Sequence, residues 1–207
     1  MIQMAENANN HPPHTNAAFD IVAIAASAGG VSALIKVLST LPAEFTAAIA
    51  IVQHLSPQHP SLMAEILSWH TAIRVKQAEE GDILTPGTAY MAAPDHHLLV
   101  NGDGTLSLSQ SESVRFLRPS ADLLFESVAA IYKNRAIALV LTGTGSDGTI
   151  GVKAIKKMGG TVIVQDIKTA EFSGMPSAVI QSGNADFILP LNEISSALMT
   201  LVMEECN

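Results

Sequence analysis

The sequence predicts a doubly wound α/β fold, in which a mostly parallel sheet carries helices on both faces and a short antiparallel hairpin at its edge. The first observation is that, from residue 19 onward, apolar strand-like runs alternate with runs of helical spacing. This alternation is typical of parallel sheets covered by helices. The second is size and composition: 207 residues, 48% of them hydrophobic, suit one domain with a substantial core.

The alternation can be followed element by element. Strands are predicted at 19–25, 47–54, 73–78, 136–142, 161–165 and 185–190. Helices are predicted at 32–41, 61–69, 118–132, 147–160, 175–183 and 191–205. Residues 88–94 and 97–109 are expected to form short antiparallel strands, and the Asn-Gly-Asp-Gly turn at 101–104 folds the second segment into a hairpin.

The ends of the chain and its charge limit the cellular context. Residues 1–18 are rich in Asn, His and Pro, so we expect a disordered leader followed by a single folded domain at 19–207. The chain has no secretory signal and no apolar run near the roughly 20 residues of a membrane helix. Cys206 is the only cysteine, which suits a reducing compartment, and we predict a cytoplasmic protein. A net charge of −8 argues against nucleic acid as a partner.

Three residues suited to acyl transfer follow three of the predicted strands. Ser27 and His54 stand at the ends of the first two predicted strands, and Asp147 lies in the loop that follows the strand at 136–142. Ligands of open α/β sheets bind outside the carboxyl ends of the strands, so these side chains are expected to share one crevice. Alone, each has a structural explanation, since serine and aspartate cap helices and a histidine can be a hydrogen-bonded structural residue. Together they form a Ser/His/Asp constellation.

The surroundings of Ser27 support a nucleophile. Positions 25–29 read A-A-S-A-G, which partly matches the G-x-S-x-G elbow of hydrolases, with Ala25 in the place of the first glycine. The backbone N–H groups of Ala28 and Gly29 would lie at a helix N-terminus. We predict that they form an oxyanion hole.

A dinucleotide-binding module is the first alternative. Gly143, Gly145 and Gly148 match G-x-G-x-x-G between a strand and a helix, and Asp166 follows about 20 residues on, as a ribose-binding acid does. Asp147 weakens this alternative because it places a negative charge in the loop that would hold a pyrophosphate. A catalytically idle binding domain derived from an esterase is the second alternative.

The histidines do not predict a metal site. They lack H-x-x-x-H spacing and cysteine partners, so we expect solvated or structural histidines at His59, His70, His96 and His97. We therefore predict neither a metal nor a cofactor.

Five blocks of the sequence resemble a known family. They read IAASAGGVSAL, IVQHLSP, LRPSADLLFESVA, LTGTGSDGTIGVKAIKKMGG and AEFSGMPSAVI. In order and spacing they are similar to the catalytic domain of CheB-type chemotaxis protein-glutamate methylesterases, over about residues 19–202. Within that family, the sequences of these blocks most resemble the esterase modules of hybrid methyltransferase–sensor proteins. The resemblance implies a doubly wound esterase whose triad is Ser27, His54 and Asp147, with the glycine-rich block serving as a triad loop.

The resemblance also implies a substrate. Enzymes of this family remove methyl esters from glutamate side chains on the coiled-coil region of chemoreceptors, release methanol, and deamidate particular glutamines. The implied partner is the methylated coiled coil of a chemoreceptor or similar signalling protein, with response-regulator or sensor proteins as further partners. No membrane insertion is implied. Thr144, Arg118 and His97 are the residues we expect to line the substrate cleft.

The chain departs from the family pattern at three places. Many members carry an N-terminal receiver domain, whereas this sequence has only a short polar leader before residue 19, so we expect activity without phosphorylation. Ala28 stands where threonine often follows the nucleophile. Thr144 stands where some members have a methionine near the aspartate.

Overall fold

A seven-stranded parallel sheet forms the centre of the molecule. The computed structural model describes residues 19–54 and 61–203. The strands are β1 (Ile21–Ala26), β2 (Ala48–Gln53), β3 (Arg74–Gln77), β4 (Thr88–Met91), β7 (Ala136–Val140), β8 (Thr161–Gln165) and β9 (Phe187–Leu189). They lie in the order β3-β4-β2-β1-β7-β8-β9, and each neighbouring pair is parallel. The predicted fold class is confirmed.

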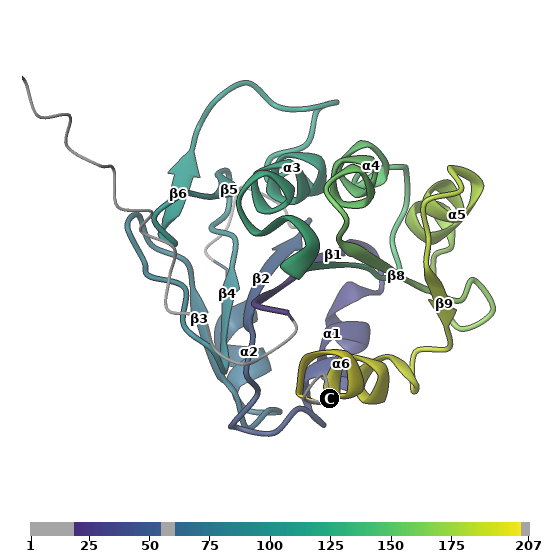
Figure 1. Ribbon diagram of the computed structural model, residues 1–207, viewed down its shortest axis with the longest axis horizontal. Coiled ribbons are helices and arrows are strands. Elements are labelled where there is room, and N and C mark those ends of the chain that lie inside the picture. Colours follow the sequence, from purple (N-terminus) through teal and green to yellow (C-terminus); the bar gives the residue numbers. More distant parts are fainter. Residues whose placement is uncertain (1–18, 55–60, 204–207) are drawn as a thin grey trace, which may run out of the picture.

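Helices cover both faces of the sheet. On one face lie α1 (Gly30–Leu38), α2 (Met63–Ser68) and α6 (Ile194–Met203), and on the other lie α3 (Ala121–Tyr132), α4 (Thr149–Lys157) and α5 (Gly174–Gln181) (Figure 1). A short 3₁₀ turn, Lys133–Arg135, follows α3. Because strand side chains alternate, Val22 and Ile24 enter the core under α1, whereas Ile21 and Ala23 enter the core under α3. Central strands buried on both faces explain the continuous apolar runs in the sequence.

The prediction for residues 88–94 is wrong in its strand direction. Thr88–Met91 forms β4, which pairs in parallel with both β2 and β3 and is buried throughout. The connection from β3 to β4 contains no helix, so the sequence lacks the helical pattern by which such a crossover is recognised.

The predicted hairpin at 97–109 is confirmed, although it is separate from the main sheet. Its strands are β5 (His97–Val100) and β6 (Leu106–Ser109), which pair with each other in an antiparallel sheet of their own. Leu98 and Leu106 join the core under α3, so the hairpin is anchored by apolar contacts rather than by strand pairing.

The topology defines where a ligand can bind. From β1 the chain moves to β2 on one side and later returns to β7 on the other, so β1 marks the point where the winding reverses. In such folds the crevice opens at the carboxyl ends of these strands. No helix within the described ranges is long and apolar enough to cross a membrane. The leader predicted at 1–18 and His59 lie outside the described residues.

Candidate active site

The three predicted triad residues lie at the carboxyl ends of three adjacent strands. Ser27 follows β1, His54 follows β2, and Asp147 lies in the loop after β7. Ala26 pairs with Gln53 in the register of β1 and β2, and the N–H of His54 donates to the carbonyl oxygen of Ala26 at 3.1 Å. Parallel pairing therefore places the serine between the strand that carries the histidine and the strand that precedes the aspartate.

Asp147 and His54 are directly hydrogen-bonded. His54 Nε2 lies 2.9 Å from Asp147 Oδ2. The same carboxylate accepts hydrogen bonds from the Ser120 hydroxyl at 3.0 Å and from the N–H groups of Ala121 at 2.7 Å and Asp122 at 3.2 Å. Burial of Asp147 opposes ionisation, but the hydrogen bonds from His54 and from this backbone lower its pKa below the ordinary value. Asp147 is therefore a carboxylate at neutral pH.

These contacts make Asp147 the cap of α3, a helix to which it does not belong. Ser120 stands at the N-cap position of α3, but its hydroxyl donates to Asp147 instead of capping the helix. In return, Asp122 in the first turn of α3 accepts the N–H groups of Ile150 at 2.9 Å and Gly151 at 2.8 Å in α4. The two helix N-termini thus exchange carboxylates.

Close packing of α3 and α4 permits this exchange. A Cβ on Gly151 would lie 2.6 Å from the Cβ of Phe125, so only glycine allows the helices to approach this closely. Asp122 Oδ2 is buried and has no hydrogen-bond partner among the described residues. Burial, together with the nearby charge of Asp147, raises the pKa of Asp122.

The contact between His54 and Asp147 leaves the other ring nitrogen of His54, Nδ1, available to a second partner. Because the carboxylate of Asp147 accepts a hydrogen bond, Nε2 carries the proton and Nδ1 keeps a free lone pair, which is the tautomer a general base requires. No hydrogen bond joins Ser27 Oγ to His54 within the described part of the chain. In resting enzymes such contacts are often long and tighten when substrate binds.

A buried glutamine that the sequence analysis missed links the turn at Ser27 to the turn at His54. Gln53 Nε2 donates to the carbonyl oxygens of Ser27 at 2.8 Å and of His54 at 3.1 Å. On the other side of the turn, Thr142 Oγ1 donates to the carbonyl oxygen of Ala28 at 3.0 Å. The only signal for Gln53 in the sequence is a polar residue at the end of an otherwise apolar strand.

The turn after Ser27 presents backbone donors. The N–H of Gly30 folds back to the carbonyl oxygen of Ser27 at 2.8 Å, whereas the N–H groups of Ala28 and Gly29 donate to no residue that the structure describes. Gly29 has a φ of 74°, in the left-handed region that favours glycine. A Cβ there would also lie 2.8 Å from Glu171 Oε2. Two free donors beside a serine suit the stabilisation of an oxyanion.

The residues expected in the substrate cleft occupy three different environments. Thr144 is exposed in the loop after β7. Arg118 is partly exposed and pairs with Asp95, its Nε lying 2.9 Å from Oδ1. His97 is fully buried and accepts the N–H of Ser120 on Nδ1 at 3.1 Å. A side chain with no exposed surface cannot touch a substrate, so His97 lies behind the site, contrary to expectation.

The glycine-rich loop is packed in a way that does not suit a dinucleotide. A Cβ on Gly143 would lie 2.3 Å from Met175 Sδ and 2.9 Å from the Cβ of Ser27, so this glycine permits close packing against Ser27. Asp147 turns inward to cap α3, and Asp166 accepts the N–H of Lys168 within its own turn. Across 19–54 and 61–203, no cluster of three His, Cys, Asp or Glu side chains could hold a metal ion.

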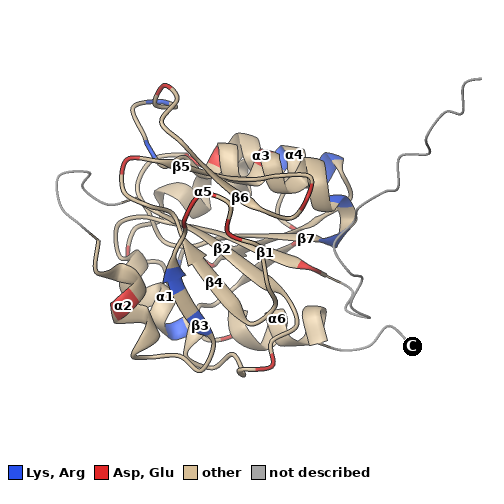
Figure 2. Cartoon of the chain, turned by 90° about the vertical axis from the view of Figure 1, so that its left-hand side faces the viewer, with Lys and Arg blue, Asp and Glu red and all other residues tan. Residues whose placement is uncertain are grey.

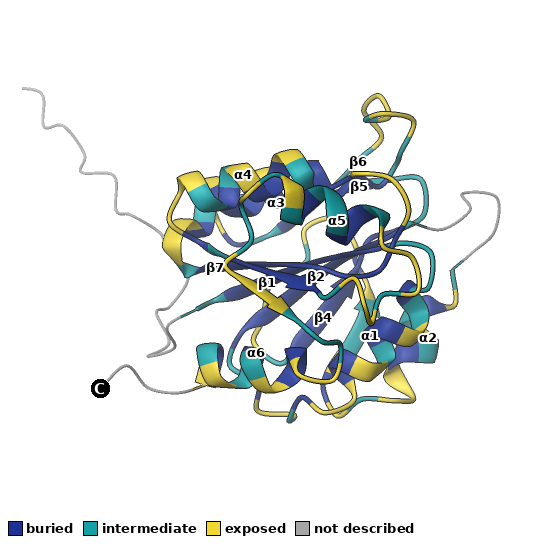
Figure 3. Cartoon of the chain, turned by 90° about the vertical axis from the view of Figure 1, so that its right-hand side faces the viewer, coloured by how far each residue is buried: buried dark blue, intermediate teal, exposed yellow. Residues whose placement is uncertain are grey.

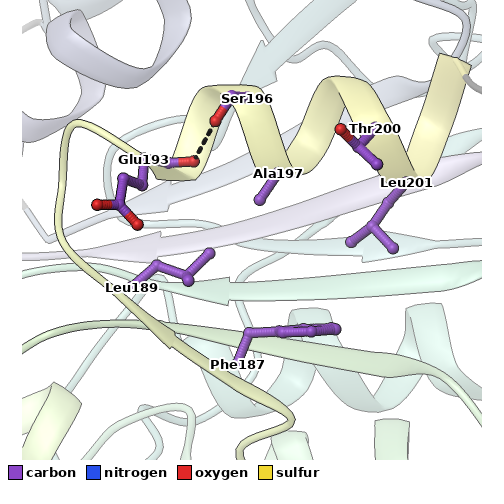
Figure 4. Close-up of a pocket in the computed structure, with 7 residues that line it drawn as sticks. All are labelled: Phe187, Leu189, Glu193, Ser196, Ala197, Thr200 and Leu201. Carbon is purple, nitrogen blue, oxygen red and sulfur yellow. Dashed lines mark hydrogen bonds between the residues drawn. The ribbon is translucent and has the colours of Figure 1, made fainter.

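A separate hollow lies between β9 and α6 (Figure 4). It has a volume of about 480 Å³ and is lined by Phe187, Leu189, Glu193, Ser196, Ala197, Thr200 and Leu201. None of these residues belongs to the triad, so the groove is distinct from the site at the strand ends.

Comparison with known proteins identifies the family. The family model described as CheB methylesterase matches residues 22–198. A putative protein-glutamate methylesterase/protein-glutamine glutaminase of Leptospira interrogans is 39% identical over 183 residues, which cover 88% of this chain and 95% of that protein. The protein-glutamate methylesterase FrzG of Myxococcus xanthus is 40% identical over 200 residues, covering 97% of this chain and 58% of FrzG.

A solved structure agrees with this result. The crystal structure of the Thermotoga maritima CheB methylesterase catalytic domain matches with a TM-score of 0.86 at 38% identity, covering 89% of this chain and 99% of that domain. The fold and the strand-end site define a serine-hydrolase-like α/β protein, and the chain belongs to the CheB methylesterase family. The predicted class of enzyme is confirmed, and the dinucleotide-binding and idle-domain alternatives find no support in these relatives.

Proposed function

We propose that this protein hydrolyses glutamate γ-methyl esters on a signalling protein, with Ser27 as nucleophile, His54 as general base and Asp147 as the group that orients it. The observation that carries the proposal is the 2.9 Å contact between His54 and Asp147 at the strand end next to Ser27. Membership of the CheB methylesterase family supports the same chemistry.

The reaction follows from the positions of these groups. Ser27 Oγ attacks the ester carbonyl carbon while His54 Nδ1 takes its proton, and the carboxylate of Asp147 stabilises the imidazolium. The tetrahedral oxyanion is held by the N–H groups of Ala28 and Gly29. When the intermediate collapses, methoxide leaves with the proton from His54 as methanol. Water activated by His54 then hydrolyses the acyl-enzyme, which releases the glutamate side chain and regenerates the serine.

Deamidation of glutamine uses the same steps with ammonia as the leaving group. Several relatives carry both activities in their names, and the acyl-enzyme is identical in the two reactions. We propose the methylated helical region of a chemoreceptor or a similar signalling protein as the substrate, residues 19–207 as one catalytic unit, and the cytoplasm as its location. Response-regulator or sensor proteins are the proposed further partners.

Methanol release tests this function. Purified protein incubated with methylated receptor fragments should release methanol, and Ser27→Ala should abolish nearly all of it. A parent protein that releases none from any methylated fragment, yet binds NAD tightly, would reverse the assignment in favour of the dinucleotide-binding alternative.

A further inference from the structure

The segment between β6 and α3 folds into a small hairpin whose tip is exposed. The N–H of Val114 donates to the carbonyl oxygen of Leu117 at 3.1 Å, and the N–H of Leu117 donates back to Val114 at 2.9 Å. Arg115 and Phe116 form the two-residue tip, and Phe116 is fully exposed. In Figure 3 the segment projects from the molecule beyond β5 and β6, and Figure 2 shows both basic and acidic residues on it. We call residues 114–117 the tip hairpin.

The backbone of the tip hairpin is strained for the residues that it carries. Arg115 has a φ of 50° and Phe116 a φ of 67°, both in the left-handed region. Two-residue turns of this type favour Asn-Gly, because bulky side chains are disfavoured at positive φ. Strained residues of this kind cluster at active sites and ligand-binding segments. A fully exposed aromatic ring on a strained turn contributes nothing to the core of this molecule.

The tip hairpin is held in a fixed position relative to the triad. His97 Nδ1 accepts the N–H of Ser120, so its Nε2 carries the proton and donates to the carbonyl oxygen of Glu112 at 3.3 Å, just before the hairpin. Burial lowers the pKa of His97, which keeps this imidazole neutral. The hydroxyl of Ser120 in turn donates to Asp147. At the tip, Arg115 Nη1 lies 3.4 Å from the hydroxyl of Ser146, the neighbour of Asp147.

Arg118 fixes the chain on both sides of the tip hairpin. Arg118 donates through Nη1 to the carbonyl oxygens of Gln110 at 3.1 Å and Ser111 at 2.9 Å, while its Nη2 lies 2.8 Å from Asp95. The guanidinium of Arg118 is therefore occupied by contacts within the molecule. Arg115, in contrast, forms no ion pair with any carboxylate that the structure describes. In a chain with a net charge of −8, the tip hairpin thus presents an unpaired cation and an exposed aromatic ring beside the triad.

We propose that the tip hairpin is the docking element for an acidic helix of the substrate protein, with Phe116 packing between apolar side chains of that helix and Arg115 pairing with one of its carboxylates. This inference rests on the proposed function. The reaction converts a methyl ester into a glutamate carboxylate, so a helix that bears several such sites is acidic wherever it is not methylated. A cation next to the triad is complementary in charge to that helix.

The test compares a protein substrate with a small ester. Arg115→Asn/Phe116→Gly replaces the tip with the sequence its backbone favours, so this variant should fold at least as well as the parent. With a methylated receptor fragment as substrate, we expect kcat/KM to fall by about 10- to 100-fold, mainly because KM rises. A loss of this size is typical when an aromatic residue at the centre of a protein interface is truncated. Hydrolysis of p-nitrophenyl acetate should be unchanged. Phe187→Ala, which removes an exposed aromatic ring from edge strand β9, is the matched control and should change neither rate.

The outcomes separate docking from catalysis. If the tip variant processes the receptor fragment as fast as the parent, or loses small-ester hydrolysis to the same extent, the docking assignment is wrong. A parent protein inactive on both substrates would instead refute the proposed function. Charge is tested independently, because Arg115→Glu should raise KM for the fragment more than Arg115→Lys, and added salt should reduce the difference between them. Equal KM values for these two variants would also refute the ion pair.

Discussion

Replacing Asp147 by asparagine should separate the two tasks of this carboxylate. Its Oδ1 accepts hydrogen bonds from Ser120, Asp122 and Gly148, and its Oδ2 accepts from Ala121 and His54. An asparagine has one acceptor oxygen. With that oxygen in the Oδ1 position, the amide group faces His54 and the N–H of Ala121, so the helix donor loses its acceptor.

The magnitudes follow from these contacts. A buried N–H without an acceptor costs about 1–3 kcal/mol of unfolding free energy. For a chain of this length, about 1 kcal/mol lowers Tm by roughly 2–4 °C, so Asp147→Asn should lower Tm by about 2–12 °C. The new amide donates to His54 Nε2 and forces the proton onto Nδ1, the atom that we propose accepts the proton of Ser27. The same change in serine proteases lowers the rate about 10⁴-fold, and we expect a loss of about 10²- to 10⁴-fold in kcat.

Asp122→Asn is the matched control. It removes the neighbouring carboxylate charge, yet its amide oxygen can still accept the N–H groups of Ile150 and Gly151. It also leaves the tautomer of His54 unchanged. Methanol release by both variants should show a large loss of rate for Asp147→Asn only. Thermal unfolding of the same two variants measures the change in Tm. If Asp147→Asn keeps more than about a tenth of the parent rate, or loses no more than Asp122→Asn, the orienting role of Asp147 is refuted.

The pH dependence of stability distinguishes the two carboxyls further. The pKa of Asp147 is lowered on folding, so its ionisation stabilises the fold above its ordinary value of 3.8, and this contribution is lost as pH falls through the folded pKa. The pKa of Asp122 is raised, so its contribution is present below 3.8 and is lost as pH rises through its folded pKa. Relative to the parent, Asp122→Asn should therefore gain stability from acid to neutral pH, whereas Asp147→Asn should lose it.

Three further predictions concern the nucleophile, its support and the leader. The double variant Ser27→Ala/His54→Gln should be hardly slower than either single variant, because the residues act as a unit; additive losses in single-turnover rates would show independent roles. Gln53→Leu should lower kcat with little change in KM, since the carbonyl oxygens of Ser27 and His54 lose their shared donor; a kcat equal to that of the parent would refute this positioning role. Deletion of 1–18 should leave methanol release within about tenfold of the full chain, because the sequence of this segment is polar and aperiodic, and a larger change would mark it as regulatory.

The sequence was sufficient to predict the fold class and to nominate the triad. Parallel strands end at one edge of the sheet, so the polar residues after each apolar run could be assigned to one crevice without a structure. The parallel direction of β4 could not be predicted, because its crossover lacks a helix. Nor could the burial of His97, since a histidine at the start of a strand has the same local pattern whether it faces solvent or an adjacent helix.

Gln53 shows a different limit of sequence analysis. Its position at the end of β2 was predictable, but its function depends on two carbonyl oxygens supplied by turns after different strands. Hydrogen bonds from a side chain to a distant backbone leave no periodic signal. Such contacts are recognised only when the register of neighbouring strands is known, and here that register sets Gln53 beside Ala26.

The exchange of carboxylates between α3 and α4 explains why the glycine-rich loop resembled a nucleotide site. A helix N-terminus that follows a strand attracts an anion, and in dinucleotide-binding folds that anion is a pyrophosphate. Here the N-terminus of α4 is satisfied by Asp122, and that of α3 by Asp147. The carboxylate of Asp147, whose charge argued against a phosphate in the loop, is thus the anion that binds the N-terminus of α3. Because one oxygen of Asp147 binds both α3 and His54, the stability of the fold and the orientation of the proposed base depend on the same atom.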